Sequence, residues 1–336
     1  METRPKMIYL PDTMANWPWP RAINPHFEAV KIEADAWLHS FKPLNPKTLD
    51  AFDKCNAAYL VALANPTVSR EHLRVGCEVM NMQLVVDEVT DISTGAGANG
   101  ILDIAIDALH NPHKIRPEGE HIFGEMMRQC SARAMQTISI TCQRRFIDSF
   151  TAYLRAVAAE AIDREQRHCR SIDDHFKHRR ESSGIMVWLV LCGMDMDLPD
   201  EVFYHPAIVD MFECTADLIT VDNDMISYNR EQATGIDYNS LITVVMLEFG
   251  LDIGSAMGWA AAYHTKLEKR FTDGLAKIPS WGPSTDIVVK KYIDGLGNWV
   301  RASDCWSFDI QRYLGTMGAE IQQSRLVPLL SKKSQS

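Results

Sequence analysis

Apolar residues recur at intervals of three and four along most of the chain, which is the pattern of amphipathic helices. Between residues 26 and 40 the apolar face carries Phe27, Val30, Ala34 and Leu38. Residues 47–64 and 69–91 repeat this pattern. Alternating runs of β-branched residues bounded by tight turns, which would indicate strands, are almost absent. The pattern therefore predicts an all-α protein.

Helix-breaking residues divide the chain into about ten or more predicted helices. These breaks fall at residues 93–100, 111–120, 195–200 and 274–284. Five prolines within residues 1–25 forbid a regular helix there and predict an N-terminal arm. Because no Gly/Ser or Pro-rich linker interrupts the middle of the chain, we predict a single helical domain over 26–325 and a flexible tail over 326–336.

The composition narrows the possible functions. A formal net charge of −10 argues against nucleic-acid binding, which favours a basic surface. Eight cysteines without a C-x-x-C pair indicate reduced thiols and a cytoplasmic protein. The longest apolar run, residues 185–192, is far below the ~20 residues needed to span a bilayer. We therefore expect no membrane span.

Three acids follow an apolar run at the end of the predicted helix 69–91. Asp87 and Asp91 are four positions apart and share a helix face, while Glu88 is offset from them. Like charges at that spacing cost ~0.2–0.5 kcal/mol unless a cation bridges them. A helix C-terminus also disfavours anions. Such local violations tend to mark functional sites, although a solvated acidic helix end is the alternative.

A second polar stripe lies on a later predicted helix. Asn223, Ser227 and Glu231 follow an i, i+4, i+8 spacing that places an amide, a hydroxyl and a carboxylate on one face. All three offer oxygen, which Mg²⁺ and Mn²⁺ prefer. Neither cluster contains sulfur or imidazole, so zinc is disfavoured. The alternative is a polar surface stripe.

Two other features have competing interpretations. Trp299, Trp306 and Tyr313 are spaced seven apart, which predicts an aromatic stripe that belongs either to the core or to a pocket. The sequence also offers a rival metal set, formed by Asp173, Asp174, His175 and His178. Flanking arginines favour a charged helix surface for that set.

The two metal motifs together resemble those of class I terpene synthases. They are D-E-x-x-D at residues 87–91 and N-D-x-x-S-x-x-x-E at 223–231. The stretches LPDTMANWPWPRAINPH, RRESSG and WSFDIQRYLG are similar to those of basidiomycete sesquiterpene synthases, and the resemblance runs from about residue 8 to about 325. It implies a single domain of antiparallel helices around a central apolar cavity.

The resemblance also implies an activity, which is the metal-dependent ionisation and cyclisation of farnesyl diphosphate. Three Mg²⁺ ions are expected, and Mn²⁺ can replace them. The arm and the stretch NWVRASDCWSFDIQRYLG are most similar to those of enzymes that form Δ6-protoilludene by 1,11-closure through a humulyl cation. Relatives with the same motifs close C1 to C10 and give cadinane-type products. A chain-elongating prenyl diphosphate synthase or a silent lipid-diphosphate binder is the remaining alternative, and both a monomer and a homodimer are possible.

Residue roles follow from the same resemblance. Asp87 is expected to contact metal most directly, with Glu88 as a tolerated variant of the second aspartate. Asp91 is expected to assist closure or to make outer metal contacts. The second motif should hold one further ion through Asn223, Ser227 and Glu231.

The arginines are expected to bind the diphosphate. An arginine just before a helix break senses it in the family, which favours Arg180 if Gly184 is the break residue, or Arg179 if Ser183 is. Arg230 and the pair Arg312 and Tyr313 match further diphosphate ligands. The residues expected to line the hydrocarbon pocket are Leu84, Gly184, Trp188, Trp306 and Tyr313.

Overall fold

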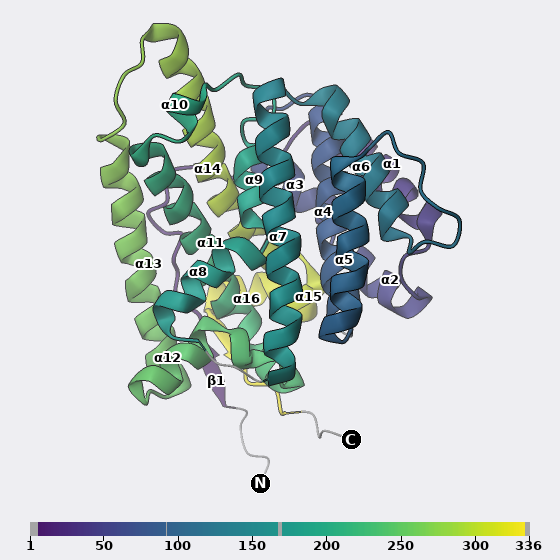
Figure 1. Ribbon diagram of the computed structural model, residues 1–336. Helices are drawn as coiled ribbons and strands as arrows, with labels where there is room; N and C mark the ends of the chain where they lie inside the picture. The colour runs from purple at the N-terminus through teal and green to yellow at the C-terminus, as the bar shows by residue number, and fades with distance from the viewer. Residues whose placement is uncertain (1–5, 92, 167–169, 333–336) are drawn as a thin grey trace.

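The computed structural model describes residues 6–91, 93–166 and 170–332, and in these ranges the fold is built from helices with one short two-stranded ribbon (Figure 1). The all-α prediction is confirmed. The first half of the chain forms α1 (Phe27–Phe41), α2 (Pro46–Asp53), α3 (Ala57–Ala64), α4 (Arg70–Thr90), α5 (Gly95–His110), α6 (Phe123–Thr137) and α7 (Ile140–Gln166). The second half forms α8 (Ile172–Ser182), α9 (Ile185–Leu191), α10 (Asp200–Phe203), α11 (Pro206–Thr234), η1 (Asp237–Asn239), α12 (Leu241–Phe249), α13 (Ile253–Leu275), α14 (Pro283–Asp309), α15 (Gln311–Leu314), η2 (Gly315–Met317) and α16 (Gly318–Ser324).

Side-chain caps set several of the helix starts. Ser69 accepts a hydrogen bond from the backbone N–H of His72 and so begins α4. Thr94 caps α5 in the same way, through the N–H of Gly97. The break predicted at residues 93–100 is therefore narrower than expected, because α5 already begins at Gly95.

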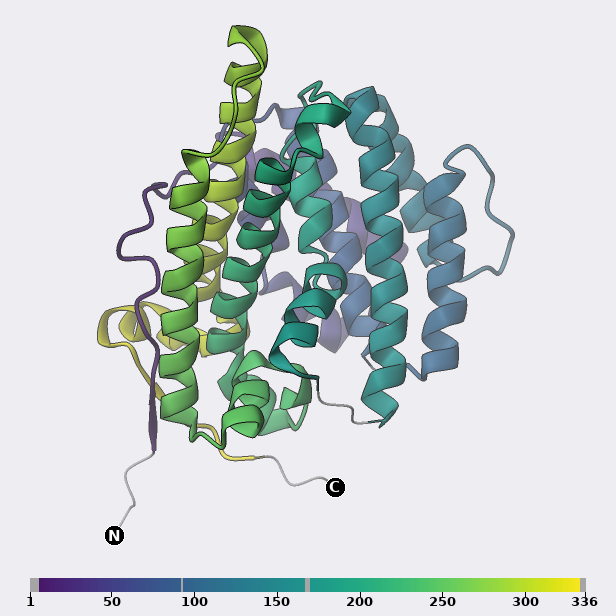
Figure 2. The ribbon, with the colours of Figure 1, turned by 60° about the vertical axis from the view of Figure 1, so that its left-hand side comes forward.

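Long helices run up and down the molecule and enclose its middle (Figures 1 and 2). The helix α4 packs against α1, α3 and α6, and α11 packs against α8, α13 and α14. The largest fully buried side chains include Trp299, Tyr292, Phe123 and Phe146. Each such side chain stabilises the fold by roughly 1.5–3 kcal/mol relative to exposure. The core therefore holds the long helices rigidly around the centre of the domain.

The N-terminal arm is ordered and lies along α13 and α14 (Figure 2). The indole N–H of Trp17 donates to the carbonyl of Gly297, and the ring of Trp19 fills the space where a Cβ at 297 would lie. Arg301 donates to the carbonyls of Trp17 and Trp19. These contacts anchor a segment that its prolines keep from being helical.

The segment after α16 corrects the prediction of a flexible tail over 326–336. Strand β2 (Leu326–Pro328) pairs antiparallel with β1 (Met7–Tyr9) in the arm. Asn229 donates to the carbonyl of Pro328, and Gln232 donates to that of Leu330. The ribbon thus joins both ends of the described chain to α11, and residues 333–336 lie outside the described residues.

No single helix in the described ranges is long and apolar enough to cross a membrane. One pair, α12 and α13, passes a test of length and composition only when taken together, and the two helices meet at 110°. The seven described cysteines, which exclude Cys169, are buried free thiols.

Candidate active site

A cavity of about 570 Å³ lies between α3, α4, α7, α8, α9, α11, α14 and α15. The residues expected from the sequence that line it are Leu84, Asp87, Asp91, Arg179, Trp188, Asn223, Ser227, Arg230, Glu231, Trp306, Arg312 and Tyr313. The two metal motifs and the aromatic stripe therefore surround one space, although they come from distant parts of the chain. Two expected residues, Arg180 and Gly184, are not among those that line it.

Asp87 and Asp91 lie at the C-terminal end of α4, where both face the cavity. Burial and the nearby charge of Asp91 raise the pKa of Asp87 to about 7. The hydroxyl of Tyr153 lies 3.4 Å from Oδ1 of Asp87 and donates to it. Glu88 faces Arg312, with 3.7 Å between Oε1 and Nη1. Asp87 thus stands in an environment that resists its negative charge.

The second cluster lies on the C-terminal half of α11. Burial, followed by repulsion from Asp224, raises the pKa of Glu231 to about 7. The hydroxyl of Ser227 is buried and makes no hydrogen bond within the described residues. The amide nitrogen of Asn223 donates to the hydroxyl of Tyr313 at 3.1 Å, which leaves its Oδ1 as an acceptor. These three side chains thus present oxygen atoms to the cavity.

The donor set fits a hard divalent cation. No group of three His, Cys, Asp or Glu side chains that could hold a metal converges in the described part of the chain. Asn223 and Ser227 supply amide and hydroxyl oxygens beside Glu231. A nearby cation would favour the ionised forms of Asp87 and Glu231, whose pKa values burial has raised. We therefore take these residues as the candidate metal ligands.

The structure differs from the preference for Arg180 as the arginine that faces the site. Arg179 lines the cavity and donates to Oδ1 of Asn223 at 3.3 Å and to Oδ1 of Asp224 at 3.2 Å. Arg180 points elsewhere and binds both carboxylate oxygens of Asp217, at 2.8 and 2.7 Å. Adjacent residues on α8 point about 100° apart, so the rotation of this helix turns Arg179 toward the cavity and Arg180 toward Asp217 on α11.

The helix break between α8 and α9 lies at residues 183 and 184. Gly184 has φ +72, a conformation that L side chains rarely adopt, and it begins α9. Its carbonyl accepts from Nε2 of Gln83 at 3.2 Å. The neighbouring Ser182, Ser183 and Ile185 line the cavity instead of Gly184. The expected pocket role of Gly184 is therefore corrected to a turn beside the pocket.

Two further arginines line the cavity opposite α8. Arg230 precedes Glu231 on α11, and Arg312 belongs to the short helix α15. Nη1 of Arg312 lies 3.3 Å from Sγ of Cys55. These cations stand among the carboxylates and leave donors that an anionic ligand could use.

Aromatic rings form much of the remaining wall. The rings of Trp188 and Trp299 lie 5.0 Å apart, and those of Trp306 and Tyr313 lie 5.8 Å apart. The indole N–H of Trp306 donates to the carbonyl of Cys55, so its ring is fixed. In the stripe, Trp299 and Trp306 are buried and Tyr313 is partly buried, and all three line the pocket.

The cavity also contains polar residues that were not expected to line it, namely Gln83, Tyr153, Glu160, Asp224 and Asn239. Gln83 lies one helical turn before Asp87, so its spacing alone placed it on the same face. The two histidines of the rival metal set pair with carboxylates of this group. His175 lies 3.1 Å from Asp224, and His178 lies 3.6 Å from Glu160.

Comparisons with known proteins show which family this chain belongs to. Residues 78–270 match the family "Terpene synthase family 2, C-terminal metal binding". The chain is 47% identical to Sesquiterpene synthase 14 of Postia placenta, over 99% of this chain and 95% of that protein. It is 46% identical to Delta(6)-protoilludene synthase 18 of the same fungus, over 97% and 94%. A Delta(6)-protoilludene synthase of Armillaria gallica is 43% identical, over 97% and 94%.

Solved structures share the fold at much lower identity. A single-residue variant of cucumene synthase superposes with a TM-score of 0.76 at 21% identity, covering 87% of this chain and 99% of that one. An α-eudesmol synthase gives a TM-score of 0.78 at 18% identity, over 88% and 98%. With the motifs gathered in one cavity and relatives matched over nearly their whole length, the chain belongs to the class I terpene synthases, within the basidiomycete sesquiterpene synthases.

Proposed function

We propose that this terpene cyclase binds farnesyl diphosphate with three Mg²⁺ ions, for which Mn²⁺ can substitute, and converts it to Δ6-protoilludene with release of diphosphate. The observation that supports this most directly is the division of the cavity wall. Carboxylates and arginines at the ends of α4, α8 and α15 stand next to a wall of Leu84, Trp188 and Trp306. A ligand that is anionic at one end and apolar along its length suits such a space.

The size of the cavity agrees with a substrate of this class. At about 570 Å³, it lies within the range of ~300–1,000 Å³ that is usual for small-molecule sites. Its apolar part is lined by side chains from several helices, including Leu60, Met80, Val157 and Ile219. These residues would exclude water from the hydrocarbon chain.

The polar residues have defined tasks in ionisation. Asp87, Asn223, Ser227 and Glu231 would hold the metal ions, which supply Lewis-acid stabilisation of the departing diphosphate when bound. Arg179, Arg230 and Arg312 would donate charge-assisted hydrogen bonds to its oxygens. As the allylic C–O bond breaks, the electron pair leaves with diphosphate, and preorganised donors lower the barrier.

The apolar part of the cavity would then handle the carbocation. The faces of Trp188, Trp299 and Trp306 can stabilise positive charge by about 0.5–2 kcal/mol each. The bond between C1 and C11 forms first, and loss of a proton from the last cation gives the neutral hydrocarbon. Rigid rings favour one folding of the chain over others.

The 1,11 route is supported by the relatives named Delta(6)-protoilludene synthase, at 46% and 43% identity. The 1,10 route to cadinane-type products uses the same metal motifs and is the second candidate. A location in the cytoplasm, as a monomer or a homodimer, remains our prediction from the sequence.

One incubation tests the proposal. Purified protein is mixed with farnesyl diphosphate and Mg²⁺, and the volatiles are identified by gas chromatography with mass spectrometry. Δ6-protoilludene is the expected main product. A cadinane-type main product would overturn the 1,11 route, a longer diphosphate would indicate chain elongation, and the absence of any product would indicate a binding protein.

A further inference from the structure

Gln83 is a buried polar residue inside an otherwise aromatic part of the cavity wall. It lies on α4, four positions before Asp87, and its side chain is only 5% exposed. A buried amide without hydrogen-bond partners would destabilise the fold. Partners for both ends of this amide are therefore expected, and they identify what the residue holds in place.

The two ends of the amide bind two different elements of the cavity wall. Oε1 accepts from the indole N–H of Trp188 on α9. Nε2 donates to the carbonyl of Gly184, at the break between α8 and α9. The orientation of the amide is unambiguous, because an indole nitrogen can only donate and a carbonyl can only accept.

The break is shaped to receive this side chain. A Cβ at residue 184 would lie 2.6 Å from Nε2 of Gln83 and 3.2 Å from Cε2 of Tyr153. A side chain there would push the Gln83 amide aside and crowd Tyr153, and the φ of +72 independently favours glycine. The amide of Gln83 therefore occupies the space that a side chain at residue 184 would take.

The held indole belongs to the wall that would face the hydrocarbon. The ring of Trp188 lies 5.0 Å from that of Trp299, and both line the cavity. A series of contacts thus runs from the metal-bearing helix α4 through Gln83 to the two tryptophans. Movement of the Trp188 ring would change the shape of the pocket without touching a metal ligand.

We propose that Gln83 is a positioning residue that sets product specificity, by fixing the helix break at Gly184 and the ring plane of Trp188. This inference rests on the proposed function, because it concerns how the substrate chain folds. Whether Gln83 holds the helix break in place can be tested without substrate. If the two hydrogen bonds of Gln83 are lost, the helix break at Gly184 should open more often. The aromatic wall should then admit more than one folding of the substrate chain.

The first measurement is amide hydrogen exchange in the protein without substrate. Gln83→Met keeps nearly the same volume but removes both hydrogen bonds. The N–H of Val187 donates to the carbonyl of Gly184 at 3.2 Å, so it reports on the break. Its exchange should accelerate about tenfold in Gln83→Met, as expected for the loss of buried hydrogen bonds.

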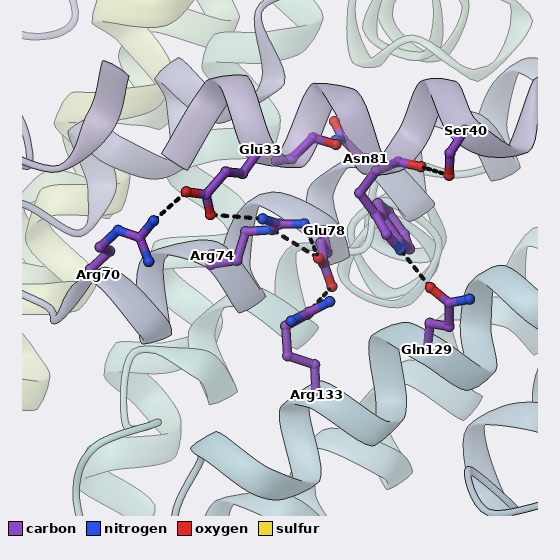
Figure 3. A network of polar contacts seen from close by, with 10 residues as sticks. Glu33, Ser40, Arg70, Arg74, Glu78, Asn81, Gln129 and Arg133 are labelled. Carbon is purple, nitrogen blue, oxygen red and sulfur yellow. Dashed lines mark hydrogen bonds and ion pairs between the residues drawn. The ribbon is translucent and has the colours of Figure 1, made fainter. Parts of the chain in front are cut away.

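A matched control is available elsewhere in the chain. Gln129 also accepts from an indole, that of Trp37 at 3.1 Å, and lies outside the cavity (Figure 3). Gln129→Met should leave the exchange of Val187 unchanged. If Gln83→Met does not fold, Gln83→Leu removes the same two hydrogen bonds with a different apolar shape, and the exchange should rise in that variant as well.

The second measurement is the product distribution from farnesyl diphosphate. In Gln83→Met the share of the main product should fall by about half or more, while the control keeps the wild-type distribution. Unchanged exchange of Val187, or an unchanged distribution, would overturn the inference. A wild-type protein that makes no terpene would instead refute the proposed function, and the exchange measurement would still decide whether Gln83 holds the break.

Discussion

The guanidinium of Arg179 donates to Oδ1 of Asn223 at 3.3 Å and so links α8 to the second metal motif on α11. The adjacent Arg180 instead binds the buried carboxylate of Asp217 with two nitrogens. The two adjacent arginines therefore have different contacts and different expected roles. Arg179 contacts a candidate metal ligand, whereas Arg180 fastens α8 to α11.

Conservative substitutions should separate these two tasks. Arg179→Lys keeps the charge but loses the planar fork, so we expect turnover to fall by about tenfold or more. The free energy of unfolding should change little, because the buried Asp224 keeps the backbone N–H of Leu241 as a partner. Arg180→Lys should leave turnover nearly unchanged but lower the free energy of unfolding by ~1–3 kcal/mol, because Asp217 is left poorly paired. Steady-state kinetics and denaturant titration measure both. The reverse pattern would restore Arg180 as the arginine that faces the diphosphate.

The metal ligands on two separate helices should both be indispensable. We expect Asp87→Ala and Asn223→Ala each to reduce turnover by about 100-fold or more at saturating Mg²⁺, because each would remove a direct ligand. Chelation with EDTA should abolish turnover in the wild type. The exposed Asp148, changed to Ala, is the matched control and should behave as wild type. A variant of Asp87 or Asn223 with a wild-type rate would refute the two-motif site.

The sequence was sufficient for the features that rest on regular spacing. Residues four apart on a helix must share a face, so Asp87 could be grouped with Asp91, and Asn223 with Ser227, from their spacing alone. The same periodicity placed Trp299 and Trp306 on one stripe. Which stripe faces which depends on how the helices pack, and for that the family resemblance was needed.

The features that were not predicted depend on non-local contacts. Whether Arg179 or Arg180 faces the cavity is set by the rotation of α8 against α11, and a one-residue error turns the side chain by about 100°. The strand Leu326–Pro328 has no strong signal of its own and is held by pairing with the arm. Gln83 belongs to no motif; its spacing from Asp87 gives its helix face, but its two hydrogen-bond partners come from α9 and from the helix break and are not predictable from spacing.

An ion-pair network around a buried acid on α4 should contribute to the free energy of unfolding. Glu78 is fully buried and contacts Arg74 at 2.7 Å and Arg133 at 2.9 Å (Figure 3). Removing it would leave Arg74 with Glu33 alone and would deprive Arg133 of this partner, so Glu78→Ala should lower the free energy of unfolding by ~1–3 kcal/mol. Arg70 pairs with Glu33 at the surface, and Arg70→Ala should cost at most ~1 kcal/mol. Equal losses in urea titrations of the two variants would contradict a special role for the buried acid.

The partly buried acid Asp304 should make stability depend on pH. Burial and the charge of Asp222 raise its pKa to about 7, while the unfolded chain has a value near 3.8. The folded state therefore favours the protonated form, and the contribution of Asp304 to stability is lost as the pH rises through 7. Asp304→Asn mimics the protonated acid, so its stability relative to wild type should increase by up to ~1.4 kcal/mol per pH unit between pH 5 and 7. Above pH 7 the difference should become constant. Urea titrations at several pH values measure it, with the exposed Asp148→Asn as a control that should show no such trend. A constant difference across this range would show that Asp304 is already ionised at pH 5.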